Sequence, residues 1–288
     1  MNDAAHTTGK AISAPKTDYL TKTHFKKGLF KKGLFKKGLL LAGLAAALIE
    51  GAVTPAAAFA KELRVASNTT FPPFEFVDNK TGETTGFEMD LIREMGKKAG
   101  YDVVIRNLGF DAIIPAILTH SVDVGASGFS VTPERAKRVL FTTPFYNSGL
   151  TVLVRRDGAP IKSVDDLRGR RIAVQIGTTA AARAKAIEGA VVTTFNHAGE
   201  AILDLENGGV DAVINDKPVT DYILARQPRL KDHLKVLPGK LTSDDFAMVV
   251  ARDNTALKAE LDAALEAMKA SGEYDRLHAK WFGEGAAH

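Results

Sequence analysis

The pattern of apolar and polar positions predicts a strand at 62–67, a helix at 87–98 and a strand at 101–106. Leucine, isoleucine and methionine recur every three or four residues in the helical segment, whereas the strands are short runs rich in valine and isoleucine. A further helix is predicted at 110–119 and a further strand at 122–126. Such alternation is typical of a sheet whose strands are joined by helices.

The same alternation begins again after Gly149. Strands are predicted at 150–154, 171–175, 191–195 and 210–215, and helices at 178–187, 198–206 and 218–225. The tail differs, because a long amphipathic helix at 254–270 is followed by a segment at 274–282 that holds the single tryptophan. We expect this tail to return and pack on an earlier sheet. We therefore predict an α/β fold with mainly parallel sheets flanked by helices.

Composition excludes several classes of protein. The chain has 288 residues, of which 45% are hydrophobic and 25% charged, so it is globular rather than disordered or collagen-like. Cysteine is absent, which excludes disulfides, cysteine-ligated zinc, iron–sulfur clusters, a cysteine nucleophile and a lipid-modified cysteine. The five histidines of 61–288 show no metal-binding spacing, and we expect no metal or other cofactor.

The net charge of +4 and the pI of about 9.1 would suggest a nucleic-acid partner. However, nine lysines and only three acidic residues lie in 1–60. The remaining 61–288 carries 29 basic and 31 acidic residues, so it is slightly acidic. Binding to nucleic acid therefore loses its main support.

The first 60 residues have the organisation of an export signal. A repeated lysine-rich pentapeptide at 26–40, which we interpret as a tandem expansion, leads into an apolar run at 39–53 and a small-x-small site that ends at Ala60. We predict a signal peptide at 1–60, cleaved after Ala60, and a periplasmic location. The alternative is a retained membrane anchor or a basic amphipathic surface helix.

A first candidate site follows the first predicted strand. Asn68 and Phe71 stand there, and ligands of open α/β sheets bind at the carboxyl ends of strands. An amide and an aromatic ring at this position could flank a small polar ligand. Phe74 and Phe76 follow closely, and for these two we expect a place in the core instead.

Two further candidates carry opposite charges. Gly128, Ser130 and Arg135 follow the strand at 122–126, and an arginine offers a bidentate fork to a carboxylate. Asp216 ends the strand at 210–215 and could hold an ammonium group. The ordinary alternatives are a solvated surface arginine and a helix N-cap aspartate. An arginine and an aspartate at two strand ends would suit a zwitterion, although spacing alone does not bring them together.

Over 61–288 the chain resembles the extracellular solute-binding proteins of polar amino-acid ABC importers, of the glutamine-, histidine- and arginine-binding type. The most specific match is Gly86-Phe87-Glu88-Met89-Asp90-Leu91, which fits the family's G-[FY]-[DE]-x-[DE]-L pattern. Other matches follow in order, namely Phe-x-x-x-Ile-Pro-Ala at 110–116, G-x-[ST]-x-T-x-E-R at 128–135, F-[ST]-x-x-[FY] at 141–145, G-T-T at 177–179, D-A-V-x-x-D at 211–216 and K-W-F-G at 280–283.

The resemblance implies a ligand site of ten residues. These are Asn68, Phe71, Phe110, Gly128, Ser130, Arg135, Gln175, Thr178, Thr179 and Asp216. Arg135, with Ser130 and the backbone at 178–179, would clamp the ligand α-carboxylate. Asp216, with the Gly128 carbonyl and the Ser130 hydroxyl, would hold the α-ammonium group. Glu88 would be structural, in the first turn of a helix.

The resemblance also implies that Phe71 and Phe110 sandwich the ligand side chain, and that Asn68 and Gln175 contact its tip. Asn68 stands where relatives often carry an acid, and Gln175 stands where a glutamine binder carries lysine. Neutral amides pair poorly with a buried cation, so the sequence favours a neutral polar amino acid, glutamine first. The alternative within the family is a binder of arginine, lysine or histidine.

The implied architecture is the two-lobed type II periplasmic-binding-protein fold. We expect one lobe from 61–147 plus 246–288 and the other from 148–245, with two hinge crossings near 145–149 and 244–248. The ligand would be captured by hinge closure, and a monomer would deliver it to an ABC permease and its ATPase at the inner membrane.

Two other functions share this fold. Some relatives are exported dehydratases that act on prephenate or arogenate, and such an enzyme needs a general acid with a perturbed pKa in the cleft. Glu88 is a nominal candidate, but its place at a helix start explains it better. We expect the chain not to be an enzyme. A receptor coupled to a sensor would use the same binding site and stays open.

Overall fold

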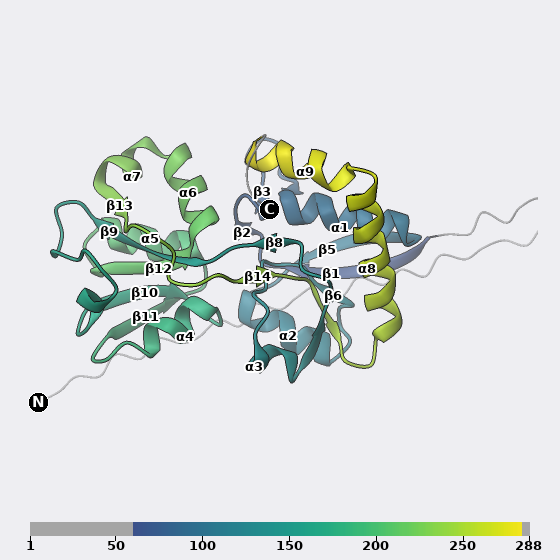
Figure 1. Ribbon diagram of the computed structural model, residues 1–288, viewed down its shortest axis with the longest axis horizontal. Coiled ribbons are helices and arrows are strands. Elements are labelled where there is room, and N and C mark those ends of the chain that lie inside the picture. Colours follow the sequence, from purple (N-terminus) through teal and green to yellow (C-terminus); the bar gives the residue numbers. More distant parts are fainter. Residues whose placement is uncertain (1–59, 284–288) are drawn as a thin grey trace, which may run out of the picture. The chain divides into compact units, whose positions relative to one another are not determined.

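The computed structural model describes residues 60–283, which contain two five-stranded sheets (Figure 1). The predicted leader falls on residues 1–60 and so lies, apart from its last residue, outside the described part. Within 60–283, no helix has the length and apolar character that crossing a membrane requires.

The first sheet has the strand order β5 (Tyr101–Asn107), β1 (Lys61–Ser67), β6 (Val124–Gly125), β15 (Val249–Ala251) and β7 (Val139–Phe141). Strand β1 runs parallel to β5 and β6, whereas β15 runs antiparallel to β6 and β7. Leu63 and Val65 of β1 belong to one apolar cluster and Ala66 to another. The alternation of side chains along β1 therefore gives the sheet two buried faces.

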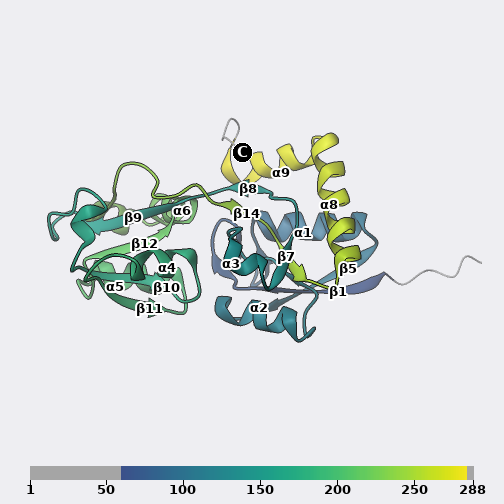
Figure 2. The ribbon, with the colours of Figure 1, turned by 60° about the horizontal axis from the view of Figure 1, so that its bottom comes forward.

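Helices cover both faces of the first sheet (Figures 1 and 2). Helix α1 (Phe87–Lys98) contacts α8 (Thr255–Ala270) and α9 (Glu273–Phe282) on one face, and α2 (Phe110–Leu118) covers the other. The tail thus returns to the first sheet, as predicted. Near the end of α9, the Lys280 ammonium and the Trp281 indole N–H both donate to Asp90 of α1. We call this sheet and its helices the first lobe.

The second sheet has the order β11 (Val191–Phe195), β10 (Arg171–Gln175), β12 (Ala212–Asp216), β9 (Leu150–Arg155) and β13 (Leu234–Val236). Around it lie α4 (Thr179–Lys185), α5 (Ala198–Glu206), α6 (Lys217–Arg226), α7 (Pro228–His233) and a 3-10 turn at Asp165–Leu167. We call this sheet and its helices the second lobe.

Each sheet is mixed, with two parallel and two antiparallel pairings, so the expectation of mainly parallel sheets is only half met. The reason lies in how two strands enter their sheets. Strand β9 comes directly from β8 (Tyr146–Asn147), and β15 comes almost directly from β14 (Asp245–Phe246). Without a crossover helix between them, neither strand needs to run parallel to its neighbours.

Strands β8 and β14 pair antiparallel with each other, with Asn147 opposite Asp245 and Tyr146 opposite Phe246. Both run between the two sheets in Figures 1 and 2. They stand at the two positions where the sequence predicts the crossings. The exact lobe boundaries at 147/148 and 245/246 remain a prediction.

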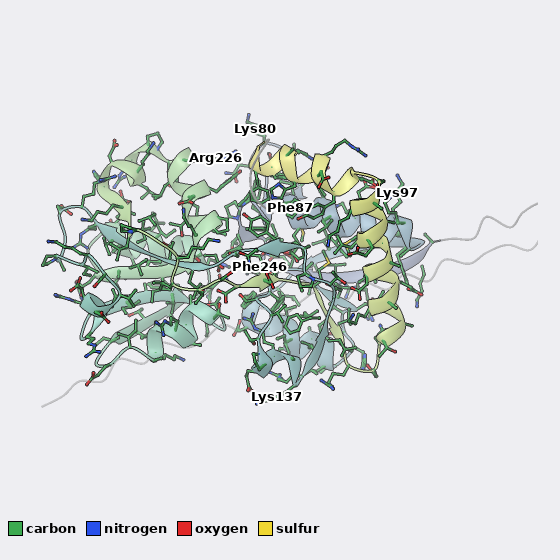
Figure 3. The ribbon with its side chains drawn as sticks, in the orientation of Figure 1. Lys80, Phe87, Lys97, Lys137, Arg226 and Phe246 are labelled. Carbon is green, nitrogen blue, oxygen red and sulfur yellow. The ribbon has the colours of Figure 1, made fainter. Side chains whose placement is uncertain are left out.

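The first lobe has an aromatic core beside β8 and β14. Phe74 is fully buried, and its ring centroid lies 5.3 Å from that of Phe246 and 4.9 Å from that of Tyr146. Phe87 lies near the same group (Figure 3). Phe74 is thus a core residue, as expected, whereas Phe76 is only half-buried.

The sequence did not predict several short elements. These are α3 (Pro133–Ala136), α7, and a three-stranded sheet formed by β2 (Thr70–Phe71), β3 (Glu75–Val77) and β4 (Thr84–Thr85). Two to six residues are too few to show a period. The small sheet nevertheless matters for the site, because Phe71 lies on β2 and Glu75 on β3.

Candidate functional site

A narrow cavity lies between the two lobes. All ten residues of the predicted ligand site line it, together with Glu75 and Ser127. Asn68 and Gly128 follow strands of the first sheet, whereas Gln175 and Asp216 end strands of the second. The carboxyl ends of strands from both sheets therefore meet here, as expected for an α/β ligand site.

Arg135 is held on both sides of the cavity. Its Nη1 donates to the Ser130 carbonyl at 2.9 Å, and its Nη2 donates to the Gly177 carbonyl of the second lobe at 3.2 Å. The guanidinium carbon lies 5.3 Å from the ring centroid of Phe110 and 5.2 Å from that of Phe129. These contacts use two of its five N–H groups, so a fork remains for a carboxylate.

Burial lowers the pKa of Arg135 to about 10, opposed by the charges of Asp216 and Asp244. The group still carries its charge at neutral pH. Its place next to the cavity therefore supports an electrostatic role rather than that of a solvated surface arginine.

Asp216 stands at the N-cap position of α6, but its carboxylate makes no hydrogen bond to the helix. Instead, the Ser148 hydroxyl donates to Asp216 Oδ1 at 3.0 Å. Burial raises the pKa of Asp216 to about 7, while the bond from Ser148 and the charge of Arg135 act in the opposite direction. The helix-capping alternative thus explains the position of Asp216 and not the direction of its carboxylate.

The two threonines begin α4 on the second lobe. The Thr178 hydroxyl accepts from the Ala181 N–H and donates to the Gln175 carbonyl, which fixes the turn after β10. The Thr179 hydroxyl lies 3.4 Å from the Ser130 hydroxyl of the first lobe. Thr179 and Ser130 therefore form one of the contacts between the lobes.

Phe71 and Phe110 are both 7% exposed and face the cavity from the first lobe. Phe110 also stacks on Phe129, with ring centroids 4.6 Å apart. At Gly128 the backbone has φ +57, and a Cβ would meet the Phe71 ring at 3.2 Å. Glycine at 128 therefore allows the aromatic wall to approach the backbone.

Asn68 and Gln175 are hydrogen-bonded to each other across the lobes. Gln175 Nε2 donates to Asn68 Oδ1 at 3.1 Å and to the Asn196 carbonyl at 3.0 Å. Asn68 Oδ1 also accepts from the Thr70 hydroxyl at 2.7 Å. Both hydrogens of the Gln175 amide and both lone pairs of the Asn68 oxygen are therefore in use.

The sequence did not predict Glu75 as a lining residue. It is fully buried on β3, and Ser127 Oγ donates to its Oε1 at 3.2 Å. Side chains alternate along a strand, so placing Phe74 and Phe76 in the core predicts a solvent-exposed Glu75. The structure buries Glu75 instead. The one feature of the sequence that could have indicated a lining role for Glu75 is its position directly after the predicted ligand loop.

Glu88 is also fully buried, although it stands in the first turn of α1. The Gly128 N–H donates to Glu88 Oε2 at 2.7 Å, so this carboxyl holds the backbone of the site. Burial raises the pKa of Glu88 to about 8. Burial and the nearby Glu88 raise the pKa of Glu75 well above its usual range. The expectation that the helix dipole accounts for Glu88 is therefore wrong.

No group of three or more histidine, aspartate or glutamate side chains in residues 60–283 is placed to hold a metal ion.

Comparison with known proteins gives the family. Residues 63–284 match the bacterial extracellular solute-binding proteins, family 3. This chain belongs to that family. The match covers both lobes, and the α/β fold with two mixed sheets agrees with the type II periplasmic-binding-protein architecture that the sequence predicts.

Two curated relatives are similar over most of the chain. A putative ABC transporter arginine-binding protein 2 of Escherichia coli K12 is 34% identical, over 82% of this chain and 96% of the relative. A probable histidine-binding protein of Neisseria gonorrhoeae is 31% identical, over 80% of this chain and 87% of the relative. Both names describe binding proteins rather than enzymes.

A solved structure of an ancestral arginine-binding protein bound to arginine has a TM-score of 0.74 and 34% identity. The match covers 78% of this chain and all of that one. A structure of an ancestral arginine-binding protein bound to glutamine has a TM-score of 0.72 and 34% identity, and covers 77% of this chain and 98% of that one.

Proposed function

We propose that this protein captures a basic amino acid, arginine first, and delivers it to an ABC importer. The observation that carries the proposal is the buried Glu75 on the cavity wall. Its Oε2 has no donor among the described residues, and Asp216 supplies a second buried carboxyl in the same cavity. Unused acceptors favour a ligand rich in donors, such as a guanidinium or ammonium group.

The hydrogen bonds of Asn68 and Gln175 argue against the glutamine preference. A neutral amide at the ligand tip would pair with these two side chains, but their main donors and acceptors already bind each other and the neighbouring backbone. The names of the relatives point the same way, because they describe arginine and histidine binders. The basic amino-acid alternative is therefore the better supported one.

Charge balance also favours a cationic ligand. Arg135 brings one positive charge to the cavity, and ionised Asp216 brings one negative charge. If Glu75 and Glu88 share a single proton, the pair adds another negative charge. In this state an amino acid with a cationic side chain, whose net charge is +1, would neutralise the cavity. Glutamine would leave a buried negative charge or would require a second proton on the pair.

Within this proposal, Arg135 clamps the ligand α-carboxylate and Asp216 holds its α-ammonium group. The aromatic rings of Phe71 and Phe110 cover the aliphatic part of the side chain. Glu75 faces the cationic tip, where a carboxylate and a guanidinium form charge-assisted hydrogen bonds. Asn68 and Gln175 join the lobes rather than reading the ligand.

Capture proceeds by closure of the lobes about β8 and β14. Contacts that cross between the lobes include Arg135 with the Gly177 carbonyl and Gln175 with Asn68. A ligand that adds bonds to both lobes stabilises the closed state by its differential affinity. We place the hinge at 145–149 and 244–248, with lobes of 61–147 plus 246–288 and 148–245.

The proposal includes export to the periplasm by the predicted leader at 1–60 and action there as a monomer. The relatives described as ABC transporter binding proteins support delivery to a membrane permease driven by an ATPase. The family supports the same class of partner.

A thermal-shift panel of ligand-stripped protein against the common amino acids tests the proposal. Ligand at about 100 times its Kd adds roughly 2.7 kcal/mol to the free energy of unfolding. For a domain of this size the melting temperature should rise by about 5–11 °C. We expect the largest shift with arginine, followed by lysine or histidine. A shift with glutamine alone would contradict the proposal that Glu75 binds a cationic ligand side chain.

One observation favours a second candidate, a dehydratase acting on prephenate or arogenate. Glu75 is a carboxyl on the cavity wall whose raised pKa suits a general acid. Asp216, however, is kept at the position that would hold an α-ammonium group, which favours an amino-acid ligand. Turnover of either compound by the purified protein would favour the enzyme over the binding role.

A further inference from the structure

Glu75 on the cavity wall and Glu88 behind it form a pair of buried carboxyls. Both are fully buried, and the groups that donate to them, the Ser127 hydroxyl and the Gly128 N–H, are neighbours in the chain. Glu75 Oε2 and Glu88 Oε1 find no N–H or O–H donor in any other described side chain or backbone. Two neighbouring carboxyls that are buried without a cation favour the protonated form, because each ionised group would be an unpaired buried charge.

The outer oxygens of the pair are fixed by neutral donors. Ser127 Oγ donates to Glu75 Oε1 at 3.2 Å, and the Gly128 N–H donates to Glu88 Oε2 at 2.7 Å. Each bond leaves the second oxygen of its carboxyl without a donor among the described residues. Only Glu75 lines the cavity, so a ligand reaches the pair through this residue.

The charged groups that face the pair do not neutralise it. Asp216 on β12 adds a second negative charge near Glu75. Arg135 lines the same cavity, but its electrostatic partners are Asp216 and Asp244. Buried carboxylates without a cation are strongly unfavourable, so both carboxyls of the pair keep their protons until a cation arrives.

We propose that Glu75 and Glu88 act together as the specificity-determining end of the cavity, and that a cationic ligand side chain displaces a proton from the pair. The O–H bond of one carboxyl breaks, its proton passes to the solvent buffer, and the carboxylate left behind pairs with the guanidinium or ammonium group. A neutral side chain cannot compensate the negative charge that release would leave on the pair, so both protons stay. The inference rests on the proposed function.

Proton release from the Glu75–Glu88 pair can be separated from amino-acid binding as such by comparing arginine with citrulline. Citrulline has a neutral urea group in place of the guanidinium. Both ligands place an α-ammonium group near Asp216, so any proton released from Asp216 is common to both. The difference between them reports the Glu75–Glu88 pair.

The experiment is titration calorimetry of the ligand-stripped protein near pH 7 in phosphate and in Tris, which differ in their heat of ionisation. We expect arginine to release up to one more proton per bound ligand than citrulline. Binding that releases a proton becomes more favourable as the pH rises, so the Kd for arginine should fall by up to about tenfold for each pH unit. The Kd for citrulline should fall less steeply.

Two variants assign the proton. The double variant Glu75→Gln with Glu88→Gln keeps acceptors for Ser127 and Gly128 and removes both titrating groups, so the difference between arginine and citrulline should disappear. Glu83→Gln, at an exposed position of the same lobe, is the matched control and should retain the difference. The comparison in the unmodified protein does not depend on the folding of either variant.

Equal proton release with arginine and citrulline, or a difference that persists in the double variant, would overturn the inference while leaving arginine binding intact. Absence of any arginine binding by the unmodified protein would instead overturn the proposed function, and the inference with it.

Discussion

At the scale of single residues, Arg135 is the group on which we expect ligand capture to depend most. Its guanidinium contacts carbonyls of both lobes and keeps three N–H groups for other partners. Replacing it leaves a ligand carboxylate without a counter-charge in a largely enclosed cavity. Loss of a charge-assisted bidentate pair typically costs several kcal/mol of binding free energy.

We therefore expect Arg135→Ala to weaken amino-acid binding by at least about 100-fold, since each 1.4 kcal/mol is tenfold in Kd. The melting temperature of the unliganded variant should change little, because only two hydrogen bonds to carbonyls are lost. Arg138→Ala, at an exposed position in the same segment, is the control. Calorimetric affinity within threefold of the unmodified protein would contradict the clamp.

Most of the site could be predicted because each residue stands in a recognisable local pattern. Asn68, Gly128, Gln175 and Asp216 lie at or just after strand ends, where ligands of α/β proteins bind. Glu75 could not be predicted in the same way, because it belongs to a three-residue strand whose buried face no period reveals. The pairing of Asn68 with Gln175, 107 residues apart, depends on the meeting of two lobes.

At the scale of elements, the turn before α1 shows why the G-[FY]-[DE]-x-[DE]-L segment begins with glycine. Gly86 has φ +132, and a Cβ there would lie 2.1 Å from the Phe74 carbonyl oxygen. The next two residues donate backbone N–H groups to Pro73 and Phe74. Glycine thus lets α1 start directly against the strand that carries Glu75.

Gly86→Ala should therefore lower the free energy of unfolding by at least about 2 kcal/mol, through strain and displacement of the backbone. The melting temperature should fall by roughly 4–8 °C. Gly82→Ala is the matched control, because Gly82 also has a positive φ but has no atom within 4 Å of the added Cβ. Its cost should be about 1 kcal/mol. Equal destabilisation by both substitutions would show that the close approach to Phe74 has no effect.

Element type could be predicted well, and strand direction could not. The helices at 87–98 and 254–270 have long periodic patterns, and the structure has them with nearly the same bounds. Strands β9 and β15 look like any other apolar run in the sequence. Their antiparallel direction follows from the paired connections β8 and β14. Each of these connections has only two residues, which is too short for a hydrophobic pattern that would predict it.

At the scale of the whole molecule, the two lobes complete one another's chemistry. The first lobe contributes Arg135, Glu75 and the aromatic walls, whereas the second contributes Asp216 and the start of α4. In the proposed binding mode, the arginine for the α-carboxylate comes from the first lobe and the aspartate for the α-ammonium group comes from the second. We therefore expect ligand binding to be coupled to closure, and the ligand that best balances the charges of the cavity to favour the closed state most.

The central claim is that this cavity selects a cationic amino acid, and titration calorimetry of ligand-stripped protein with L-arginine and L-glutamine tests it most directly. Burying an unbalanced negative charge costs glutamine more than arginine, so we predict an arginine Kd at least about tenfold lower. A glutamine Kd equal to or lower than that of arginine would contradict the role assigned to Glu75.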